Sequence, residues 1–553
     1  MRKKQQMNQQ RANKNKSKKE ETLNFIADTY AQLVQDGVIF PRRSDLKELG
    51  ITRDAIHHHF GTIAKLRKYS KERNPGSFEG AIDLDVYLSG TNVKRRLNRI
   101  KKFKRFIITT AVSGQPMHEG FIKSIDGYCK ANNAKLLLLP SHDPAHNLDN
   151  EIEWHFDPSL LDYDFIFEEM ALNSNVFISE IRVTAKQINP VTGLTEISQN
   201  KGSFIFASPK QSLEFDSVSA NKLPHARMST GACTLPNYKS TRGNSLRTAY
   251  LATFQHVIGA VIVEVEDERI YHFRQIQAAP DGSFCDLGLE YNGSKSPRKI
   301  QSTLVMGDYH AGEHDNQAVE ANIDIIDSLG VEEVIFHDMF NAASVNPHES
   351  SQIMIRAERT QSGLHSLEKE LEITAQEFDR ILGRKSVKRG VVVKSNHDDM
   401  IDRWVSRASF AQDPVNFKIG CRLAAELFGT NKDFFEEGLK LVGLPKYYEK
   451  LVWLTVDQDY MIGGVNCGAH GDKGPNGARG SIKSMAKAYP KCIVGHSHTP
   501  GIFKGAFQVG TTSKLRLGYN KGPSSWVHSS CLLYPNGQRQ LINCINGQWR
   551  LKA

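Results

Sequence analysis

The chain has 553 residues, with 71 Lys or Arg against 61 Asp or Glu and a formal net charge of +10. That length exceeds what one hydrophobic core supports, so we expect two or three domains, and the basic excess favours an anionic partner. No signal-peptide-like run follows the basic start, no apolar stretch approaches the roughly 18–20 residues of a membrane span, and the eight cysteines form no C-x-x-C pair. These features argue against a small peptide module, a membrane protein and a disulfide framework, and they favour the cytoplasm.

Residues 1–20 are strongly basic. Residues 1–19 hold eight Lys or Arg and no acid, with Gln and Asn between them, a composition that predicts a disordered cationic arm. A second run of eight Lys or Arg without an acid lies within residues 94–105. We therefore expect residues 76–105 to form a basic linker.

Residues 21–75, between these basic segments, have the pattern of a small helical domain. Apolar residues recur at helical spacing from Leu23 to Val34, and residues 44–60 predict a short helix, a turn and a second helix that Thr52 caps. This is the spacing of a DNA-binding helix-turn-helix, and a plain three-helix packing unit is the alternative. The candidate DNA contacts in this region are Arg53, His57, His58, Lys65, Arg67 and Lys68.

Residues 106–297 predict a second α/β domain. Residues 106–112 and 136–139 are strand-like runs on either side of a helical stretch at 120–132, and together they make a β-α-β unit. A further helix is expected over residues 247–255. Later strand-like runs are expected to continue the same sheet: 203–207, 258–265 and 270–273. No residue pattern here specifies a function.

Residues 298–553 carry the clearest chemical signal, five short polar islands in a fixed order. The islands are Gly307-Asp308-Tyr309-His310, His337-Asp338, Ser395-Asn396-His397-Asp398, Gly468-Ala469-His470 and Gly495-His496-Ser497-His498. Four of them follow apolar runs with the length and β-branched content of buried strands: 303–306, 331–336, 391–393 and 492–494. Because loops at the carboxyl ends of strands converge on one crevice of an open α/β sheet, we expect the islands to be neighbours in the fold.

The residue types in the islands indicate which ligand they would bind. Carboxylate oxygens, imidazole nitrogens and one amide oxygen suit divalent Mn, Fe or Zn, whereas an all-oxygen set would suit Mg or Ca. Two metals roughly 3.5–4 Å apart need one bridging ligand, about three further ligands each and a water or hydroxide as nucleophile. The islands supply about that number of ligands. A degenerate, inactive site is the alternative.

The series of islands resembles the calcineurin-like metallophosphoesterase superfamily, whose pattern runs D-x-H, G-D, G-N-H-D/E, H and G-H-x-H. The resemblance covers about residues 298–515 and implies a four-layer α/β sandwich. It implies these assignments: Asp308, His310 and His498 on the first metal, Asn396, His470 and His496 on the second, Asp338 bridging both, and His397 as the general acid. The chain departs from the pattern at three positions, where His337, Asn341 and Ser395 replace glycine, an acidic residue and glycine. We expect altered geometry with the metals retained.

Several residues near the islands have an open role. His314, Asp315 and His337 are either hydrogen-bond partners of the ligands or ordinary surface residues. Arg403 is either a phosphate clamp or a surface residue, and Lys473 would border the crevice as a wall for a polyanion. We include Arg403 and Lys473 among the candidate DNA contacts.

Helical insertions and terminal strands complete this region. A long amphipathic helix is expected over residues 358–382 and a mostly helical insertion over residues 400–442, and both would shape access to the crevice. Three strands are expected after the last island, the second and third joined by a hairpin at 535–537: 503–509, 525–534 and 540–551.

The chain combines a predicted phosphodiester-cleaving centre with a cationic arm and a predicted DNA-reading helix. Duplex DNA is the substrate that accounts for all three features. Within the superfamily, the likeness is to the SbcD-type DNA repair nucleases. The whole arrangement also resembles the pre-early proteins with which T5-like bacteriophages degrade host DNA. This resemblance implies a DNase in the cytoplasm of an infected bacterium that uses two divalent metals, Mn first, with Mg, Fe or Zn as alternatives. We expect a homo-oligomer and no membrane partner. The alternatives are a phosphoesterase for a small phosphate ester and a DNA-binding regulator with an inactive metal centre.

Overall fold

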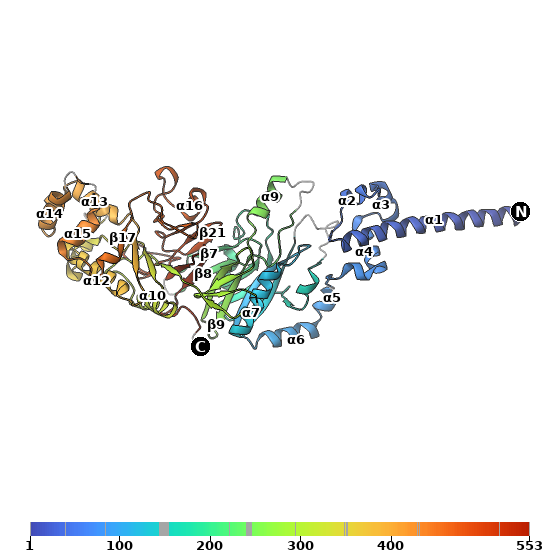
Figure 1. The fold of residues 1–553 in the computed structure, drawn as a ribbon, viewed down its shortest axis with the longest axis horizontal. Helices are drawn as coiled ribbons and strands as arrows, with labels where there is room; N and C mark the ends of the chain where they lie inside the picture. Colours follow the sequence, from blue (N-terminus) through green and yellow to red (C-terminus); the bar gives the residue numbers. More distant parts are fainter. Residues whose placement is uncertain are drawn as a thin grey trace.

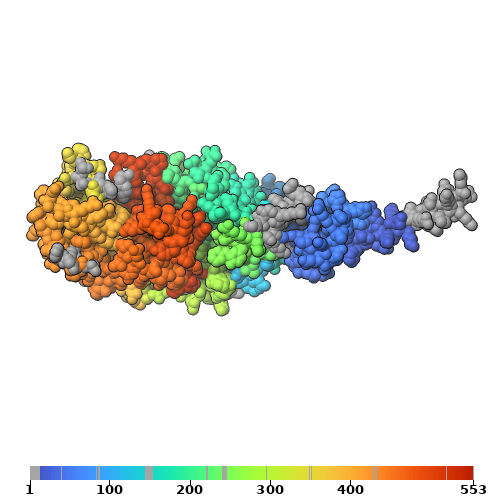
Figure 2. Space-filling model, turned by 90° about the horizontal axis from the view of Figure 1, so that it is seen from above, coloured from blue at the N-terminus to red at the C-terminus, as the bar shows by residue number. Residues whose placement is uncertain are grey.

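The computed structural model is elongated, with the N-terminal helix α1 projecting from one end and the helical insertions of the C-terminal region at the other (Figure 1). Figure 2 shows the N-terminal helical residues as a narrow lobe on a broader body. The structure describes the chain except for the following residues: 1, 39, 83, 143–153, 220–221, 239–245, 294, 348, 350–351, 428–429, 431, 519 and 552–553, and the side chains of 2–12, 85–86 and 427. Among the described helices, none is both long enough and apolar enough to cross a membrane.

The N-terminal region is helical, as predicted for residues 21–75. Its helices are α1 (Arg2–Gln35), α2 (Arg43–Glu48), α3 (Arg53–Phe60) and α4 (Ile63–Arg73). The predicted cap at Thr52 is confirmed, because its hydroxyl oxygen accepts the backbone N–H of Ala55 at 3.2 Å. Tyr30, Ile56 and Leu66 lie together in the small core of this unit.

The prediction of a disordered arm over residues 1–20 differs from the structure, where residues 2–20 are the first half of α1. Residues 2–35 contain no glycine or proline, and Lys, Arg, Gln and Ala are good helix formers. The side chains of residues 13–22 are all exposed. The basic side chains at positions 14, 16, 18 and 19 are therefore exposed on the projecting helix α1.

The expected basic linker at residues 76–105 also has structure, in α5 (Leu84–Tyr87) and α6 (Gly90–Ile100). Arg96 is buried and donates from Nη2 to Glu168 Oε1 at 2.6 Å, and Arg99 pairs with Asp164. Arg105 also pairs, with Glu264 at 3.1 Å. Three basic residues of the run thus pair with acids of the middle region, and composition alone could not reveal these partners.

The middle region contains a sheet in the order β10-β9-β1-β2-β3, here named the middle sheet. Its strands are β1 (Arg105–Ser113), β2 (Ala134–His142), β3 (Asp164–Phe165), β9 (Gly259–Val265) and β10 (Tyr271–Gln277). β1 and β2 are parallel and are connected by α7 (Glu119–Asn132), which confirms the predicted β-α-β unit. Further elements of this region are α8 (Thr195–Lys201), α9 (Leu246–Phe254), β11 (Phe284–Asp286), β12 (Leu289–Tyr291) and β13 (Arg298–Lys299).

A second sheet, the long sheet, crosses the predicted domain boundary at residue 297. Its order is β18-β19-β20-β22-β21-β7-β8-β6-β5-β4. The strands before the boundary are β4 (Met170–Ala171), β5 (Val176–Arg182), β6 (Ser203–Ala207), β7 (Ser212–Asp216) and β8 (His225–Ser229). Those after it are β18 (Met461–Ile462), β19 (Val465–Asn466), β20 (Cys492–Val494), β21 (Gly501–Phe503) and β22 (Ala506–Gln508).

The two halves of the long sheet join where Ile502 of β21 lies opposite Leu213 of β7. Residues 203–207 were expected to continue the sheet that contains β1 and β2, but they pair within the long sheet instead. Residues 106–297 and 298–553 are therefore not separate units. The sequence pattern finds a strand but does not say which distant strand it pairs with.

The C-terminal region adds a third sheet, the C-terminal sheet, in the order β17-β16-β15-β14-β23-β24. Its strands are β14 (Thr303–Val305), β15 (Glu333–Phe336), β16 (Arg389–Val392), β17 (Leu451–Trp453), β23 (Ser529–Leu533) and β24 (Arg539–Asn543). One face packs on α10 (Asn316–Leu329) and α12 (Leu367–Leu382), and the other packs on the long sheet, which α16 (Ile482–Ala488) covers on its far side. The order of layers is helix, sheet, sheet, helix, which agrees with the expected α/β class.

The other predicted elements of this region are confirmed in part. The predicted helix at 358–382 is two helices, α11 (Ile353–Ser362) and α12, because Gly363 adopts a φ of 78° and ends α11. The insertion at 400–442 is helical as expected, with α13 (Asp398–Ser406), α14 (Phe417–Leu427) and α15 (Phe434–Val442). β23 and β24 form the predicted hairpin, whereas 503–509 contains the turn between β21 and β22.

Candidate metal centre

Strand ends from two stacked sheets bring the polar islands together. The islands of Asp308, Asp338 and Asn396 follow β14, β15 and β16, which are parallel neighbours in the C-terminal sheet. The island of His498 follows β20 of the long sheet, and His470 lies in the loop after β19. The convergence expected from the apolar runs is therefore present.

The residues assigned to the first metal contact one another. His498 Nε2 lies 3.2 Å from Asp308 Oδ2 and 3.0 Å from His310 Nε2. His310 Nε2 is also 3.7 Å from Asp338 Oδ2, and His310, Asp338 and His498 each offer a ligand atom within 4.8 Å of the other two. All four side chains are buried.

The residues assigned to the second metal form the adjoining group. Asn396 Oδ1 lies 3.2 Å from His470 Nε2 and 3.0 Å from His496 Nδ1. His470 Nε2 is 3.2 Å from Asp338 Oδ2. Asp338 thus contacts both groups, which is the position that a bridging ligand requires.

His337 belongs to the same cluster, so its interpretation as a surface residue is wrong. The side chain is fully buried, and Nδ1 lies 3.3 Å from His470 Nδ1. Asp308, His337 and His470 each offer a ligand atom within 4.8 Å of the other two. Burial lowers the pKa of His337 to about 3, so the ring is neutral, which is the form that binds metals.

The backbone at the centre is strained. His310, Asp338, His496 and His498 have φ values of 53°, 45°, 74° and 59°, in the left-handed region that non-glycine residues rarely adopt. Such conformations persist where the surrounding structure enforces them, and they cluster at functional sites.

The buried donor and acceptor atoms of the centre fit divalent metals. Both carboxylate oxygens of Asp308, one of Asp338, Nε2 of His337 and Nδ1 of His498 are buried without a hydrogen-bond partner in the described structure. Buried polar atoms without partners are costly, and a bound cation would satisfy the carboxylate oxygens and unprotonated ring nitrogens.

The charges of the centre are set by burial and by one ion pair. Burial raises the pKa of Asp308 to about 8, and the carboxylate of Asp338 adds to this effect. Burial also disfavours ionisation of Asp338, but His470 and His397 outweigh it and hold the pKa of Asp338 well below its usual range. Burial disfavours the imidazolium of His470, yet Asp338 raises the pKa of His470 to about 10. Binding of a metal by Asp308 and His470 would therefore release protons.

Asn341 orients two histidines of the centre. Its side-chain oxygen accepts a hydrogen bond from His310 Nδ1 at 3.2 Å, and its backbone carbonyl accepts one from His397 Nδ1 at 2.6 Å. Each ring therefore has its hydrogen on Nδ1, so Nε2 of each ring is not committed to these two hydrogen bonds. The amide thus supplies the acceptor at the position where an acidic residue was expected.

Two further residues belong to the site, Gly495 and Trp526, to which the sequence analysis assigned no role. A Cβ at Gly495 would lie 2.3 Å from Asp308 Oδ1 and 3.1 Å from the His337 Cβ, so only glycine leaves room for both side chains. The Trp526 ring centroid lies 4.1 Å from that of His498. The glycine that begins the last island was a sequence signal that other side chains approach the backbone closely there. No sequence signal indicated Trp526.

A cavity of about 500 Å³ forms the mouth of the centre, and Asn396, His496, Arg403, Lys473 and Arg479 are among its lining residues. Lys473 donates to Asp399 at 2.8 Å, and Arg403 donates from Nε to the Asp399 backbone oxygen at 3.0 Å. Arg403 and Lys473, the two predicted DNA contacts of this region, therefore both lie at the entrance. The carboxylate of Asp399 partly compensates the charge of Lys473.

His314 and Asp315 lie outside the cluster. His314 Nδ1 accepts the backbone N–H of Gly312 at 3.2 Å, and the ring lies 3.7 Å from Glu377. Asp315 caps α10 by accepting the backbone N–H of Gln317 at 2.8 Å. Both side chains therefore have local structural roles.

One candidate DNA contact in the N-terminal region is wrong. Arg67 is 1% exposed, and its Nη2 lies 3.1 Å from His155 Nδ1 in the middle region. The sequence pattern could not show this because the partner is 88 positions away. The other candidates are exposed, as contact with DNA requires: Arg53, His57, His58, Lys65 and Lys68.

The chain is 28% identical to Protein A1 of Escherichia phage T5 over 481 residues, which cover 81% of this chain and 83% of that protein. No protein-family model and no solved structure matches the chain. The chain is thus a distant relative of a bacteriophage protein whose name states no activity. The metallophosphoesterase resemblance stays a prediction.

Proposed function

We propose that the chain is a metal-dependent DNase that hydrolyses phosphodiester bonds. The observation that carries the proposal is the buried cluster at the strand ends, in which atoms of Asp308, Asp338 and His498 have no hydrogen-bond partner in the described structure. A pair of divalent metals fits this set of oxygen and imidazole donors, with Mn first and Mg, Fe or Zn as alternatives.

The chain's own residues have distinct parts in this reaction. The metal ligands would be Asp308, His310 and His498 for one ion, Asn396, His470 and His496 for the other, and Asp338 for both. When bound, the metals would supply Lewis acidity toward the phosphate oxygens and lower the pKa of water. His397 donates from Nδ1 to the Asn341 carbonyl, so its imidazolium form would carry a second hydrogen on Nε2, and that proton would pass to the leaving oxygen and leave a neutral ring.

Charge supports DNA as the substrate. The net charge is +10, and exposed basic residues of α3 and α4, including Arg53, Lys65 and Lys68, adjoin the basic helix α1. The similarity to a phage protein supports the further proposal that host DNA is degraded in the cytoplasm of an infected bacterium. Assembly into a homo-oligomer stays a prediction.

The test combines metal content with DNA turnover. Purified protein is analysed for bound metals and then incubated with linear and closed circular duplex DNA in Mn, in Mg or in chelator. We expect bound divalent metal, cleavage of DNA with Mn and none with chelator.

Two outcomes would contradict the proposal. Hydrolysis of a small aryl phosphate with DNA left intact would indicate a phosphoesterase for small esters. Tight DNA binding without turnover in any metal would indicate a DNA-binding regulator with an inactive centre.

A further inference from the structure

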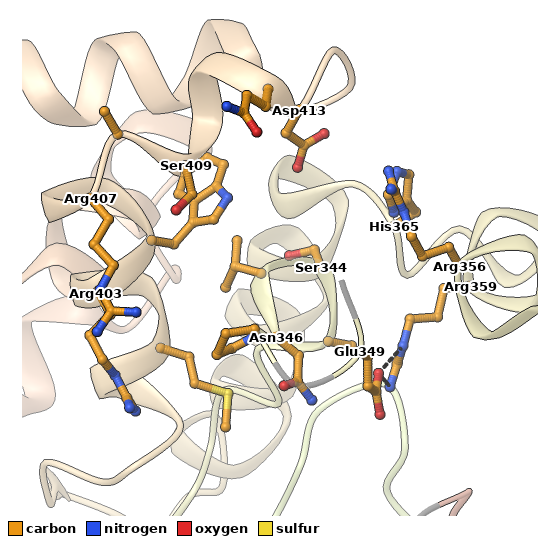
Figure 3. A pocket seen from close by; sticks show the side chains of 17 residues that line it. Ser344, Asn346, Glu349, Arg356, Arg359, His365, Arg403, Arg407, Ser409 and Asp413 are labelled. Atoms are coloured by element: carbon orange, nitrogen blue, oxygen red, sulfur yellow. Dashed lines mark hydrogen bonds and ion pairs between the residues drawn. The ribbon is translucent and has the colours of Figure 1, made fainter. Parts of the chain in front are cut away.

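A second cavity, of about 470 Å³, lies between α13 and residues 343–347 and 349. Figure 3 shows Arg403 and Arg407 on one wall and Arg356 and Arg359 on the opposite wall. Trp404 contributes apolar surface to the lining. We name this space the arginine cavity.

The arginines of this cavity differ in their partners. Arg359 is neutralised by Glu349, to which its Nε donates at 2.7 Å. Arg403 uses only Nε, in the hydrogen bond to a backbone oxygen. The side chains of Arg356 and Arg407 are exposed and make no ion pair or hydrogen bond within the part of the chain that the structure describes. Three guanidinium groups without a carboxylate partner, gathered around one cavity, favour an anion between them.

The arginine cavity adjoins the mouth of the metal centre. Arg403 lines both spaces, and the mouth also includes Asn396 and His496. α13, which carries Arg403, begins directly after His397. The carboxylates Asp399, Asp402 and Asp472 also line the mouth, and Arg403 is the basic residue shared with the arginine cavity. A strand that extends from the metal centre along α13 would therefore pass over Arg403 into the arginine cavity.

We propose that the arginine cavity holds one unpaired nucleotide of the DNA strand being cut, with its phosphates on Arg356, Arg403 and Arg407. This inference rests on the proposed function and specifies its substrate. The cavity volume lies in the range of about 300–1,000 Å³ that suits small ligands, and an intact duplex cannot enter it. Single strands, gaps and frayed ends are therefore the substrates that position a phosphodiester at the metal centre.

The test measures DNA binding by the full chain in chelator, where no cleavage occurs. The probe is a labelled single strand of about twelve nucleotides, within the site sizes known for single-strand binding, and relaxed closed circular duplex is the comparison. The variant Arg356→Gln/Arg407→Gln should bind the single strand at least about tenfold more weakly, because two charge-assisted contacts are lost. The slope of log K against log salt should become shallower by about 1.4, because each of the two lost phosphate contacts contributes about 0.7 for a single strand. Affinity for the circular duplex should change less than twofold.

The matched control is Arg422→Gln, because Arg422 is an exposed arginine of the neighbouring helix α14 that does not line the arginine cavity. It should bind both DNAs as the wild type does. Unchanged single-strand affinity in the double variant would overturn the proposal. A double variant that still binds the single strand but no longer binds thymidine monophosphate would also overturn it. That result would make the cavity a site for a free nucleotide. Failure of the wild type to cleave DNA with Mn would overturn the proposed function. The binding measurement in chelator is separate from that cleavage test, so the two failures can be distinguished.

Discussion

Two buried polar clusters of this chain differ in how their groups are satisfied. In the metal centre, Asp308, Asp338 and His498 keep buried atoms without a hydrogen-bond partner in the described structure. In the contact between α4 and the middle region, Arg67 reaches His155 at 3.1 Å, and its guanidinium also lies 4.6 Å from the ring centroid of Phe40. Both clusters contain residue types that serve catalysis elsewhere. The first keeps particular atoms without a protein partner in the described structure, which a bound cation would satisfy, whereas in the second the arginine contacts a histidine and an aromatic ring and joins two parts of the fold.

The comparison shows why residue type is a weak guide to function inside a protein. Arg67 was a reasonable DNA contact from its neighbours in sequence, but burial against a histidine removes it from the surface. The reverse holds for His337, which could have been a surface residue but is buried beside His470 in the candidate metal centre. The informative quantity is the set of partners that a buried polar group has.

The largest expected effect comes from Asp338→Asn. If Asp338 bridges two metals, loss of its charge weakens both sites, so metal content and DNA cleavage should fall together. We expect at least roughly the 10²–10³-fold loss of rate that follows removal of one electrostatic contact to a transition state. Metal analysis and a cleavage assay on linear DNA check this. Asp327→Asn, at a surface ion pair with Arg384, is the matched control and should keep both properties. Full cleavage by Asp338→Asn would refute the bridging role.

His397→Ala should separate chemistry from metal binding. A proton donor can be removed while the ligands stay, so we expect a rate loss of roughly 10²–10⁴ with both metals still bound. The loss should be smaller for a substrate with a good leaving group, such as an aryl phosphodiester, because that leaving group needs no proton. A variant that loses its metals would instead make His397 a ligand.

His337→Ala tests whether the comparison of partners identified an additional metal ligand. If Nε2 of His337 is satisfied by a metal, the variant should bind metal roughly 10–100-fold more weakly, the range reported for groups that support a metal site. Titration of the apoprotein with Mn, followed by calorimetry, measures this. Unchanged affinity would place His337 in the packing of the centre only.

The smallest expected effect concerns pH and the Arg67–His155 contact. Burial, with help from Arg67, lowers the pKa of His155 to about 3, against an ordinary value of 6.5. Below pH 6.5, His155 becomes protonated when α4 is separated from the middle region but stays neutral when α4 is docked. The free energy of docking is therefore fully present above pH 6.5 and decreases as the pH falls toward 3. Hydrogen exchange of α4 amides at pH 7 and pH 5.5, corrected for intrinsic rates, should show easier opening at the lower pH.

The control for this pH effect is His155→Gln, which has no titrating group at that position. Its opening free energy in α4 should be lower than that of the wild type at pH 7 but should no longer depend on pH in this window. Equal pH dependence in both proteins would show that another group is responsible.

Local sequence determined much of this molecule. The apolar run 492–494 is β20, the helix at 120–132 is α7 within one residue, and Thr52 caps α3, because period, capping and turn chemistry act over a few residues. The order of the polar islands likewise predicted which side chains would meet. That prediction succeeded because the carboxyl ends of parallel strands share one edge of a sheet.

The tertiary structure decided what depends on distant partners. Only the fold shows that β21 pairs with β7 across the expected domain boundary, that His337 is buried beside His470, and that Arg67 faces His155. The arginine cavity likewise exists only because α13 and residues 343–347 lie side by side in the fold. Burial and pairing are properties of residues far apart in the chain, and a local pattern contains no information about the distance between them.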